Sequence, residues 1–211
     1  AFFSISVFAQ DPTRFNQEVE ELTSLSWNAE DEREKLLFTG SSSVRMWTDL
    51  QDYFTDFQVM NTGFGGSQFS DLIYFAEELM LKHNPDRIFI YEGDNDIAEG
   101  KSPDQVLEDA KQLIQIIRQH NPEVPVYFIS PKPSIARWNL KEAYLKVNSM
   151  LNEWASETEN LYYIDVWYAM LNADGGLNTD LFLEDKLHMT QKGYDIWGEV
   201  ILGALIPGPC R

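Results

Sequence analysis

The chain has 211 residues, 44% of them hydrophobic, and it carries 16 Lys and Arg against 34 Asp and Glu, which gives a formal net charge of -18. This length suits one sizeable hydrophobic core, and the negative charge makes nucleic acid and anionic membranes poor candidates as partners because both carry dense negative charge. The single cysteine, Cys210, excludes an internal disulfide and a thiolate metal cluster.

Residues 1–10 form a short apolar run that ends in small residues before a polar segment. This pattern is typical of the end of a secretory signal, with a cut after Ala9, and the alternative is an N-terminal arm packed on the domain. We therefore expect one domain over residues 11–211 and a secreted or periplasmic protein. No apolar stretch reaches the roughly 20 residues needed to cross a bilayer, so we expect no stable membrane insertion.

Short apolar segments alternate with amphipathic helical segments along the rest of the chain. A first helix is indicated by Phe15, Val19 and Leu22 at helical spacing. The predicted strands cover residues 35–38, 57–62, 87–91, 126–130 and 162–166. Because each is short and apolar, as buried parallel strands are, the alternation predicts an α/β fold. We expect a flavodoxin-like, doubly wound, five-stranded parallel sheet with helices on both faces.

Two of the predicted helices begin with recognisable capping residues. Segment 102–105 combines a serine cap, a first-turn proline and a glutamine that can complete a capping box. Asn139 and Glu142 repeat this arrangement, and a last amphipathic helix follows Thr190. In doubly wound sheets, ligands bind outside the carboxyl ends of the strands, so the loops that leave the strands are the places to look for chemistry.

The first such loop is GSSS at 40–43, between the strand at 35–38 and a helical stretch VRMWTDL at 44–50. A serine at this turn lies at a helix amino terminus, where free N–H groups and the helix dipole favour developing negative charge. The alternative is structural, because serine is also a common helix cap and Gly-Ser turns are frequent.

Two further loops carry candidate groups. In NTGFGGS at 61–67, an N–H of Gly65 or Gly66 can point into a site, although an ordinary turn is the alternative. In EGDNDIAEG at 92–100, the acids suggest a divalent cation site, but the spacing of calcium-loop ligands is missing. Asn95 in this loop can instead donate its amide to an oxyanion.

The three histidines have different settings. His83 and His120 each precede Asn-Pro at the end of a helical stretch, where a cationic side chain is favoured without any catalytic role. His188 lies between the fifth strand and the last helix, three residues after Asp185. In a turn, that spacing lets the carboxylate hold one ring nitrogen while the other accepts a proton. A serine, candidate oxyanion donors and this pair at one sheet edge indicate an activated nucleophile.

At these residues the sequence resembles the SGNH or GDSL hydrolase family of esterases and lipases. The blocks FTGSSS, NTGFGGS, GDND and DKLH occur in the family's order, the last leading into LHMTQKGYDIW, and together they span residues 38–197. The resemblance implies that Ser42 is the nucleophile, His188 the general base and Asp185 its partner. It also implies an oxyanion hole formed by the N–H of Ser42 with Gly66 and Asn95.

One position departs from the family pattern, because Ser41 stands where the family usually has aspartate before the nucleophile. GSSS followed by VRMW, together with SPKPSIARW at 130–138, resembles a branch often found in secreted bacterial proteins. The resemblance implies hydrolysis of acyl esters, mainly short-chain or acetyl esters, through a covalent acyl-enzyme. The expected substrate is a small ester or an acylated carbohydrate, and no cofactor or metal is implied.

A rival hypothesis is a catalytically inactive carbohydrate-binding module on the same fold, with Trp47 and Trp138 as stacking platforms. Either tryptophan can equally belong to the core. Arg45 and Arg137 are candidates to contact an anionic substrate group, or they form ordinary surface ion pairs.

Overall fold

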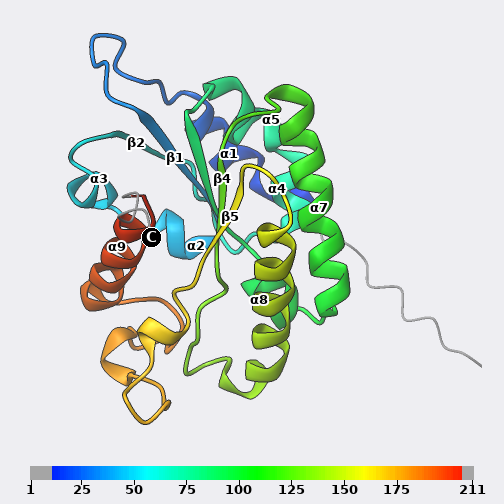
Figure 1. The fold of residues 1–211 in the computed structure, drawn as a ribbon, viewed down its shortest axis with the longest axis vertical. Coiled ribbons are helices and arrows are strands. Elements are labelled where there is room, and N and C mark those ends of the chain that lie inside the picture. Colours follow the sequence, from blue (N-terminus) through cyan, green and yellow to red (C-terminus); the bar gives the residue numbers. More distant parts are fainter. Residues whose placement is uncertain (1–10, 206–211) are drawn as a thin grey trace, which may run out of the picture.

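Five parallel strands form one sheet in the order β2-β1-β3-β4-β5 (Figure 1). The computed structural model describes residues 11–205, so the candidate signal segment 1–10 and Cys210 lie outside the described residues. This strand order is that of flavodoxin-like doubly wound sheets, which confirms the predicted fold class. The strands are β1 (Lys35–Gly40), β2 (Gln58–Asn61), β3 (Arg87–Tyr91), β4 (Val126–Ile129) and β5 (Leu161–Ile164).

The fifth strand ends earlier than its sequence suggested. The predicted range was 162–166, but pairing with β4 runs only from Leu161, opposite Val126, to Ile164, opposite Ile129. The N–H of Val166 donates to the Ser130 hydroxyl instead of a neighbouring strand. A run of apolar residues does not reveal this exchange of partners, because the hydrogen bond goes to a side chain.

Alternate residues of each strand feed two separate cores, one on each face of the sheet. Ile88 and Ile90 of β3 belong to one core, whereas Phe89 and Tyr91 belong to the other. This alternation follows from the period of two in a β-strand, and because both faces are covered, both sets are apolar.

The helices cover the two faces unequally (Figure 1). Helices α1, α4, α5, α7 and α8 contribute buried residues to the first core, and α2, α3 and α9 to the second. Helix α6 begins three residues after β3, at the carboxyl edge of the sheet. The helices are α1 (Asn16–Thr23), α2 (Ser42–Arg45), α3 (Leu50–Tyr53), α4 (Phe69–Tyr74), α5 (Ala76–Leu79), α6 (Asp94–Ala98), α7 (Pro103–His120), α8 (Lys141–Ser156) and α9 (Gln191–Leu205).

One of the two predicted helix caps is confirmed and the other is wrong. Ser102 and Gln105 form the capping box at the start of α7, each side chain accepting the other's backbone N–H. Helix α8 instead begins at Lys141 and has no side-chain cap, because Asn139 lies inside a preceding 3-10 turn, Trp138–Leu140. The 3-10 turn, rather than a side-chain cap, therefore leads the chain into α8.

The predicted helical stretch at 44–50 is also divided. Helix α2 ends at Arg45 and α3 begins at Leu50, so the segment between them is not helical.

Within residues 11–205, no helix is both long enough and apolar enough to cross a membrane.

Candidate active site

The turn that carries Ser42 is packed directly against β3. Gly40 ends β1 with φ +117°, and a Cβ atom at this position would lie 2.1 Å from the carbonyl oxygen of Tyr91. The N–H of Ser41 donates to that same carbonyl, at 3.0 Å. Only glycine combines this backbone conformation with so close an approach. The turn therefore places Ser42 at the first residue of α2, at the carboxyl edge of the sheet.

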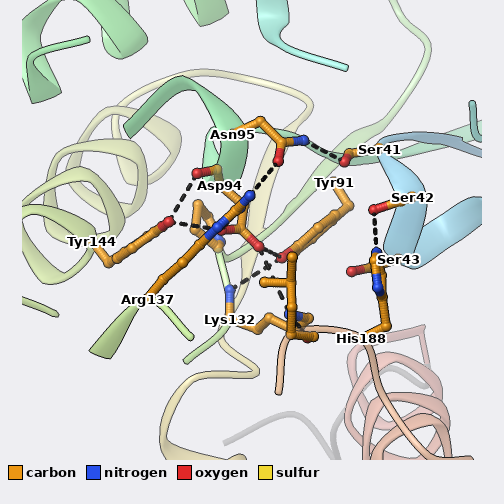
Figure 2. Close-up of polar contacts among 12 residues, drawn as sticks. Ser41, Ser42, Ser43, Tyr91, Asp94, Asn95, Lys132, Arg137, Tyr144 and His188 are labelled. Carbon is orange, nitrogen blue, oxygen red and sulfur yellow. Dashed lines mark hydrogen bonds and ion pairs between the residues drawn. The ribbon is translucent and has the colours of Figure 1, made fainter. Parts of the chain in front are cut away.

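The ring of His188 contacts the hydroxyl of Ser42, although the two residues are far apart in the sequence (Figure 2). Its Nε2 lies 2.9 Å from Ser42 Oγ, although 146 residues separate the two in the chain. Its Nδ1 lies 2.6 Å from Asp185 Oδ2. The structure thus joins the three residues that the family resemblance named as nucleophile, base and acid.

Asp185 holds the histidine through its backbone as well as its ring. Its Oδ1 accepts the N–H groups of Leu187 and His188, each at 2.9 Å. Partial burial acts to raise the pKa of Asp185, but these bonds and the contact with the His188 ring outweigh it and lower the pKa to about 2. The carboxylate therefore stays ionised at neutral pH, where it fixes the ring with Nε2 toward Ser42.

The backbone N–H groups of Gly65 and Gly66, in the loop at 61–67, have different surroundings. The N–H of Gly65 donates to both carboxylate oxygens of Glu18, at 3.0 Å each. Gly66 is exposed, and its N–H, like that of Ser42, has no acceptor within residues 11–205. Of the two glycines considered from the sequence, Gly66 is therefore the one whose N–H is not engaged by another described residue.

Asn95 lies in the first turn of α6, next to the nucleophile turn. Gly93, at φ +98°, precedes this helix and directs the chain back toward the sheet edge. The side-chain amide of Asn95 donates to Ser41 Oγ at 2.7 Å and to the Ser67 carbonyl at 2.8 Å. Ser41 thus accepts a hydrogen bond at the position where the family usually has aspartate. Both N–H groups of the Asn95 amide are thus engaged, one by the Ser41 hydroxyl and one by the Ser67 carbonyl.

A buried ion network lies beside Asn95 (Figure 2). Asp94 Oδ1 accepts hydrogen bonds from Arg137 at 2.6 Å and from the Tyr144 hydroxyl at 2.8 Å. Its Oδ2 accepts from the Tyr91 hydroxyl at 2.8 Å and lies 3.7 Å from the Lys132 ammonium. Burial acts to raise the pKa of Asp94, but the charges of Lys132 and Arg137 outweigh it and hold the pKa below its usual value.

The two arginines singled out from the sequence have different settings. Arg137 is held by Asp94 and also donates to Asn95 Oδ1, at 2.9 Å, so its guanidinium is engaged with protein groups. Arg45 is exposed and lies 3.4 Å from Glu18, as in an ordinary surface ion pair. Neither arrangement presents an unengaged guanidinium to a substrate.

Two more acids of the loop that follows β3, Glu92 and Asp96, are engaged by protein groups. Glu92 is buried and accepts a hydrogen bond from Ser67 Oγ at 2.5 Å. Burial, reinforced by nearby Asp96, raises the pKa of Glu92 well above its usual value. Asp96 pairs with Lys101 at 2.8 Å. In the part of the chain that the structure describes, no group of three or more His, Cys, Asp or Glu side chains could hold a metal ion.

Trp47, Trp138 and His83 pack against other protein groups. Trp47 is 1% exposed and stacks on Tyr194, with ring centroids 5.3 Å apart, so it is not a stacking platform for a ligand. Trp138 is half-buried and stacks on Trp167. His83 was expected to be cationic at a helix end, but burial lowers its pKa, and its Nε2 lies 3.2 Å from the Glu78 carbonyl.

Sequence reasoning missed Asp94 and Lys132. Lys132 follows the apolar strand at 126–130 almost directly. A lysine is rarely buried without an acidic partner, so its burial cannot be predicted until that partner is known. That partner, Asp94, lies beyond a different strand, so the pairing becomes visible only in the folded chain.

Solved structures of similar fold include three from bacteria. A GDSL-like lipase from Bacteroides thetaiotaomicron is 19% identical with a TM-score of 0.73, over 92% of this chain and 98% of that one. An acetylxylan esterase variant from Geobacillus stearothermophilus is 17% identical with a TM-score of 0.70, over 84% and 97% of the two chains. A lipase/acylhydrolase from Enterococcus faecalis is 20% identical with a TM-score of 0.65, over 84% and 100%.

Those likenesses establish the fold, and the family follows from the sequence. No curated protein matches the chain significantly. The model of the GDSL-like Lipase/Acylhydrolase family matches residues 24–196, a range that includes Ser42, Gly66, Asn95, Asp185 and His188. The chain therefore belongs to the GDSL-like Lipase/Acylhydrolase family.

Proposed function

We propose that the protein is a serine esterase that cleaves carboxylic acyl esters through a covalent acyl-enzyme. The observation that carries the proposal is the alignment of Ser42 Oγ, His188 and Asp185 through contacts of 2.9 and 2.6 Å. Membership in a family of lipases and acylhydrolases supports ester hydrolysis as the reaction class. A hydroxyl, an imidazole and a carboxylate in this order are the parts of an activated serine nucleophile.

In the first half of the proposed reaction, Ser42 Oγ attacks the carbonyl carbon of the ester while His188 Nε2 takes the hydroxyl proton. The resulting imidazolium is stabilised by Asp185, whose low pKa keeps it charged. The carbonyl oxygen becomes an oxyanion near the amino terminus of α2. When the tetrahedral intermediate collapses, the bond to the alcohol breaks, and His188 returns the proton to that leaving alcohol.

In the second half, water attacks the acyl group on Ser42 while His188 Nε2 again takes a proton. Collapse of this second intermediate releases the carboxylic acid and restores the serine hydroxyl. The N–H groups of Ser42 and Gly66 are the unengaged donors suited to the oxyanion in both halves, and Asn95 joins them as it yields its contact with Ser41. Donors fixed in advance in this way stabilise the charge that develops in the transition state.

For the substrate we propose a short-chain acyl ester, an acetyl ester in particular, on a small alcohol or a carbohydrate. A soluble ester can reach the site, since the side chains of His188 and Asp185 are 21% and 48% exposed. An acetylxylan esterase is among the proteins of similar fold, which agrees with acetyl transfer without establishing it.

The test is hydrolysis of 4-nitrophenyl acetate by the wild type, by Ser42→Ala and by Ser43→Ala. Ser43 is the matched control because it is the adjacent serine, but it is buried and its carbonyl accepts the Tyr194 hydroxyl. We expect hydrolysis by the wild type, loss of it in Ser42→Ala, and substantial retention in Ser43→Ala.

Intact-protein mass spectrometry after rapid acid quench should show an acetyl adduct on the wild type and none on Ser42→Ala. A wild type that hydrolyses no ester in a panel of acetylated sugars and short acyl esters would refute the proposal. Retained activity in Ser42→Ala would refute the assignment of the nucleophile.

A further inference from the structure

We infer that Arg137 is a positioning residue that orients Asn95 for binding the oxyanion. The inference rests on the proposed esterase reaction and adds a residue that does not itself touch the substrate. It assigns a role to the loop after β4, which contains Arg137, beside the triad and the two backbone donors.

The first step is the orientation of the Asn95 amide. A guanidinium offers only N–H donors, so the side-chain atom of Asn95 that faces it must be the carbonyl oxygen. Arg137 donates to Asn95 Oδ1 at 2.9 Å. The opposite side of the amide is therefore Nδ2, which reaches Ser41 Oγ at 2.7 Å, beside the nucleophile (Figure 2). The Ser67 carbonyl, which accepts from Nδ2 at 2.8 Å, favours the same orientation, and Arg137 adds a charged donor on the opposite side that disfavours the reverse, in which an oxygen would face the developing oxyanion.

The second step is the anchoring of Arg137 itself. One of its nitrogens donates to Asp94 Oδ1 at 2.6 Å while another donates to Asn95. Asp94 is fixed in turn by the hydroxyls of Tyr91 and Tyr144, each at 2.8 Å. A planar guanidinium can satisfy both acceptors in one geometry, whereas the ammonium of a lysine is a point charge that cannot reproduce this fork.

The third step is the effect of the cation on donor strength. Arg137 is charged and lies on the carbonyl side of the amide, so it draws electron density from the amide nitrogen. Hydrogen bonds that share one group in this way strengthen one another. The Nδ2 hydrogens thereby become better donors to an oxyanion than those of an isolated asparagine.

The same loop also contacts the turn that carries the base. Lys132 Nζ donates to the Leu187 carbonyl at 2.7 Å, and the Ala136 N–H donates to the Lys186 carbonyl at 3.0 Å. Loop residues 131–137 therefore lie between the oxyanion donor and the base. Arg137 acts on the first of these, and its removal should leave the contact between Lys132 and Leu187 in place.

The experiment measures kcat and KM for 4-nitrophenyl acetate in Arg137→Met and Arg137→Lys. We expect kcat to fall about ten- to a hundredfold in Arg137→Met, with KM changed by less than about threefold, because the loss falls on the transition state. Arg137→Lys should recover only a small part of this loss. A rise in KM with kcat unchanged would instead show a substrate contact and would overturn the inference.

Arg118→Met is the matched control. Arg118 is likewise partly buried, and it donates to the carbonyls of Val124 and Asn160, which precede β4 and β5 at the other end of the sheet. We expect this variant to lose stability while keeping the wild-type kcat. If it loses as much kcat as Arg137→Met does at equal stability, the effect of Arg137 is general and the inference fails.

A double-mutant cycle with Asn95→Ala tests whether Arg137 acts through Asn95. Once Asn95 is gone, Arg137→Met should lower kcat by less than about twofold, because the two losses are then not independent. Full additivity of the two losses would overturn the inference. If Arg137→Met does not fold, the same cycle is run with Arg137→Lys.

Chemical rescue supplies a readout that a purely structural role would not move. The Arg137 side chain is 19% exposed, so a small cation from solution can reach the space left by Arg137→Ala. Millimolar guanidinium should raise kcat of Arg137→Ala several-fold, whereas the same concentration of sodium should not. An active wild type with unaffected Arg137 variants refutes this inference alone, and an inactive wild type refutes the proposed function.

Discussion

The substitution Asp94→Asn removes the only carboxylate that contacts both Lys132 and Arg137 within the described residues. The Lys132 side chain is 0% exposed, so its charge cannot turn to water. Removing one partner of a buried ion pair typically costs about 3 to 5 kcal/mol of unfolding free energy, because the other charge is left uncompensated. We expect a loss in this range at pH 7.

Lys132 can limit its own share of that loss, because it can release its proton. Burial already lowers the pKa of Lys132, and the charge of Asp94 opposes this effect. Discharging a lysine whose ordinary pKa is 10.5 costs about 5 kcal/mol at pH 7, since each pKa unit corresponds to about 1.4 kcal/mol. The share of the loss that comes from Lys132 should therefore not exceed this value, whereas Arg137 keeps its charge.

The stability of Asp94→Asn should depend on pH through Lys132. In Asp94→Asn, the native state binds fewer protons at Lys132 than the unfolded state does, so stability rises with pH up to the ordinary pKa of lysine. The deficit relative to the wild type should be about 2 kcal/mol smaller at pH 9 than at pH 7.

Urea unfolding of both proteins at pH 7, 8 and 9 measures the deficit, and Glu108→Gln is the control because Glu108 and Lys111 form an exposed pair. The control should change stability little at every pH. A deficit below about 1 kcal/mol at pH 7, or one that is constant from pH 7 to 9, would refute the reasoning.

Three further substitutions have defined outcomes. Asn95→Ala should lower kcat for 4-nitrophenyl acetate about a hundredfold or more, as expected for an oxyanion donor, and should also lower the urea midpoint because it leaves the Ser67 carbonyl and Arg137 without a partner; an unchanged kcat would make Asn95 structural. Glu92→Gln removes the titrating carboxyl. Because the raised pKa of Glu92 makes wild-type stability fall as pH rises above the ordinary pKa of a glutamate, the variant should gain on the wild type with rising pH in urea unfolding, and a relative loss would contradict the raised pKa. Tyr194→Phe removes a buried hydrogen bond to the Ser43 carbonyl and should cost about 1 kcal/mol in the same assay, with activity lowered because the nucleophile turn is loosened; full activity would show that the turn is rigid without it.

The sheet was predictable because parallel strands buried on both faces are nearly all apolar. Each predicted strand overlaps an observed one, and the known handedness of the crossovers leads to the observed order. The errors occur where side chains or short turns replace regular backbone bonds, as at Val166 and at Asn139. Periodicity carries no information about such replacements.

The candidate site was likewise predictable only in part. Ser42, Asp185 and His188 come together because each follows a strand or precedes a helix at the carboxyl edge, a position that the order of elements fixes. The sequence left the choice between Gly65 and Gly66 to the family resemblance, and the structure gives a physical basis for it, since Glu18 engages Gly65. Such a contact between segments 47 residues apart depends on how α1 packs, which no local pattern encodes.

The connection between the first and last elements of the fold has a consequence for biosynthesis. Ser42 is translated well before His188, the residue whose ring contacts its hydroxyl, and Tyr194 of α9 donates to the carbonyl of Ser43. A nascent polypeptide that has completed β1 to β5 still lacks the imidazole and the helix that stacks on Trp47. The proposed activation of Ser42 therefore requires that the chain has been made through α9 and that α9 has docked, so a shorter nascent chain does not present the Ser42–His188 pair.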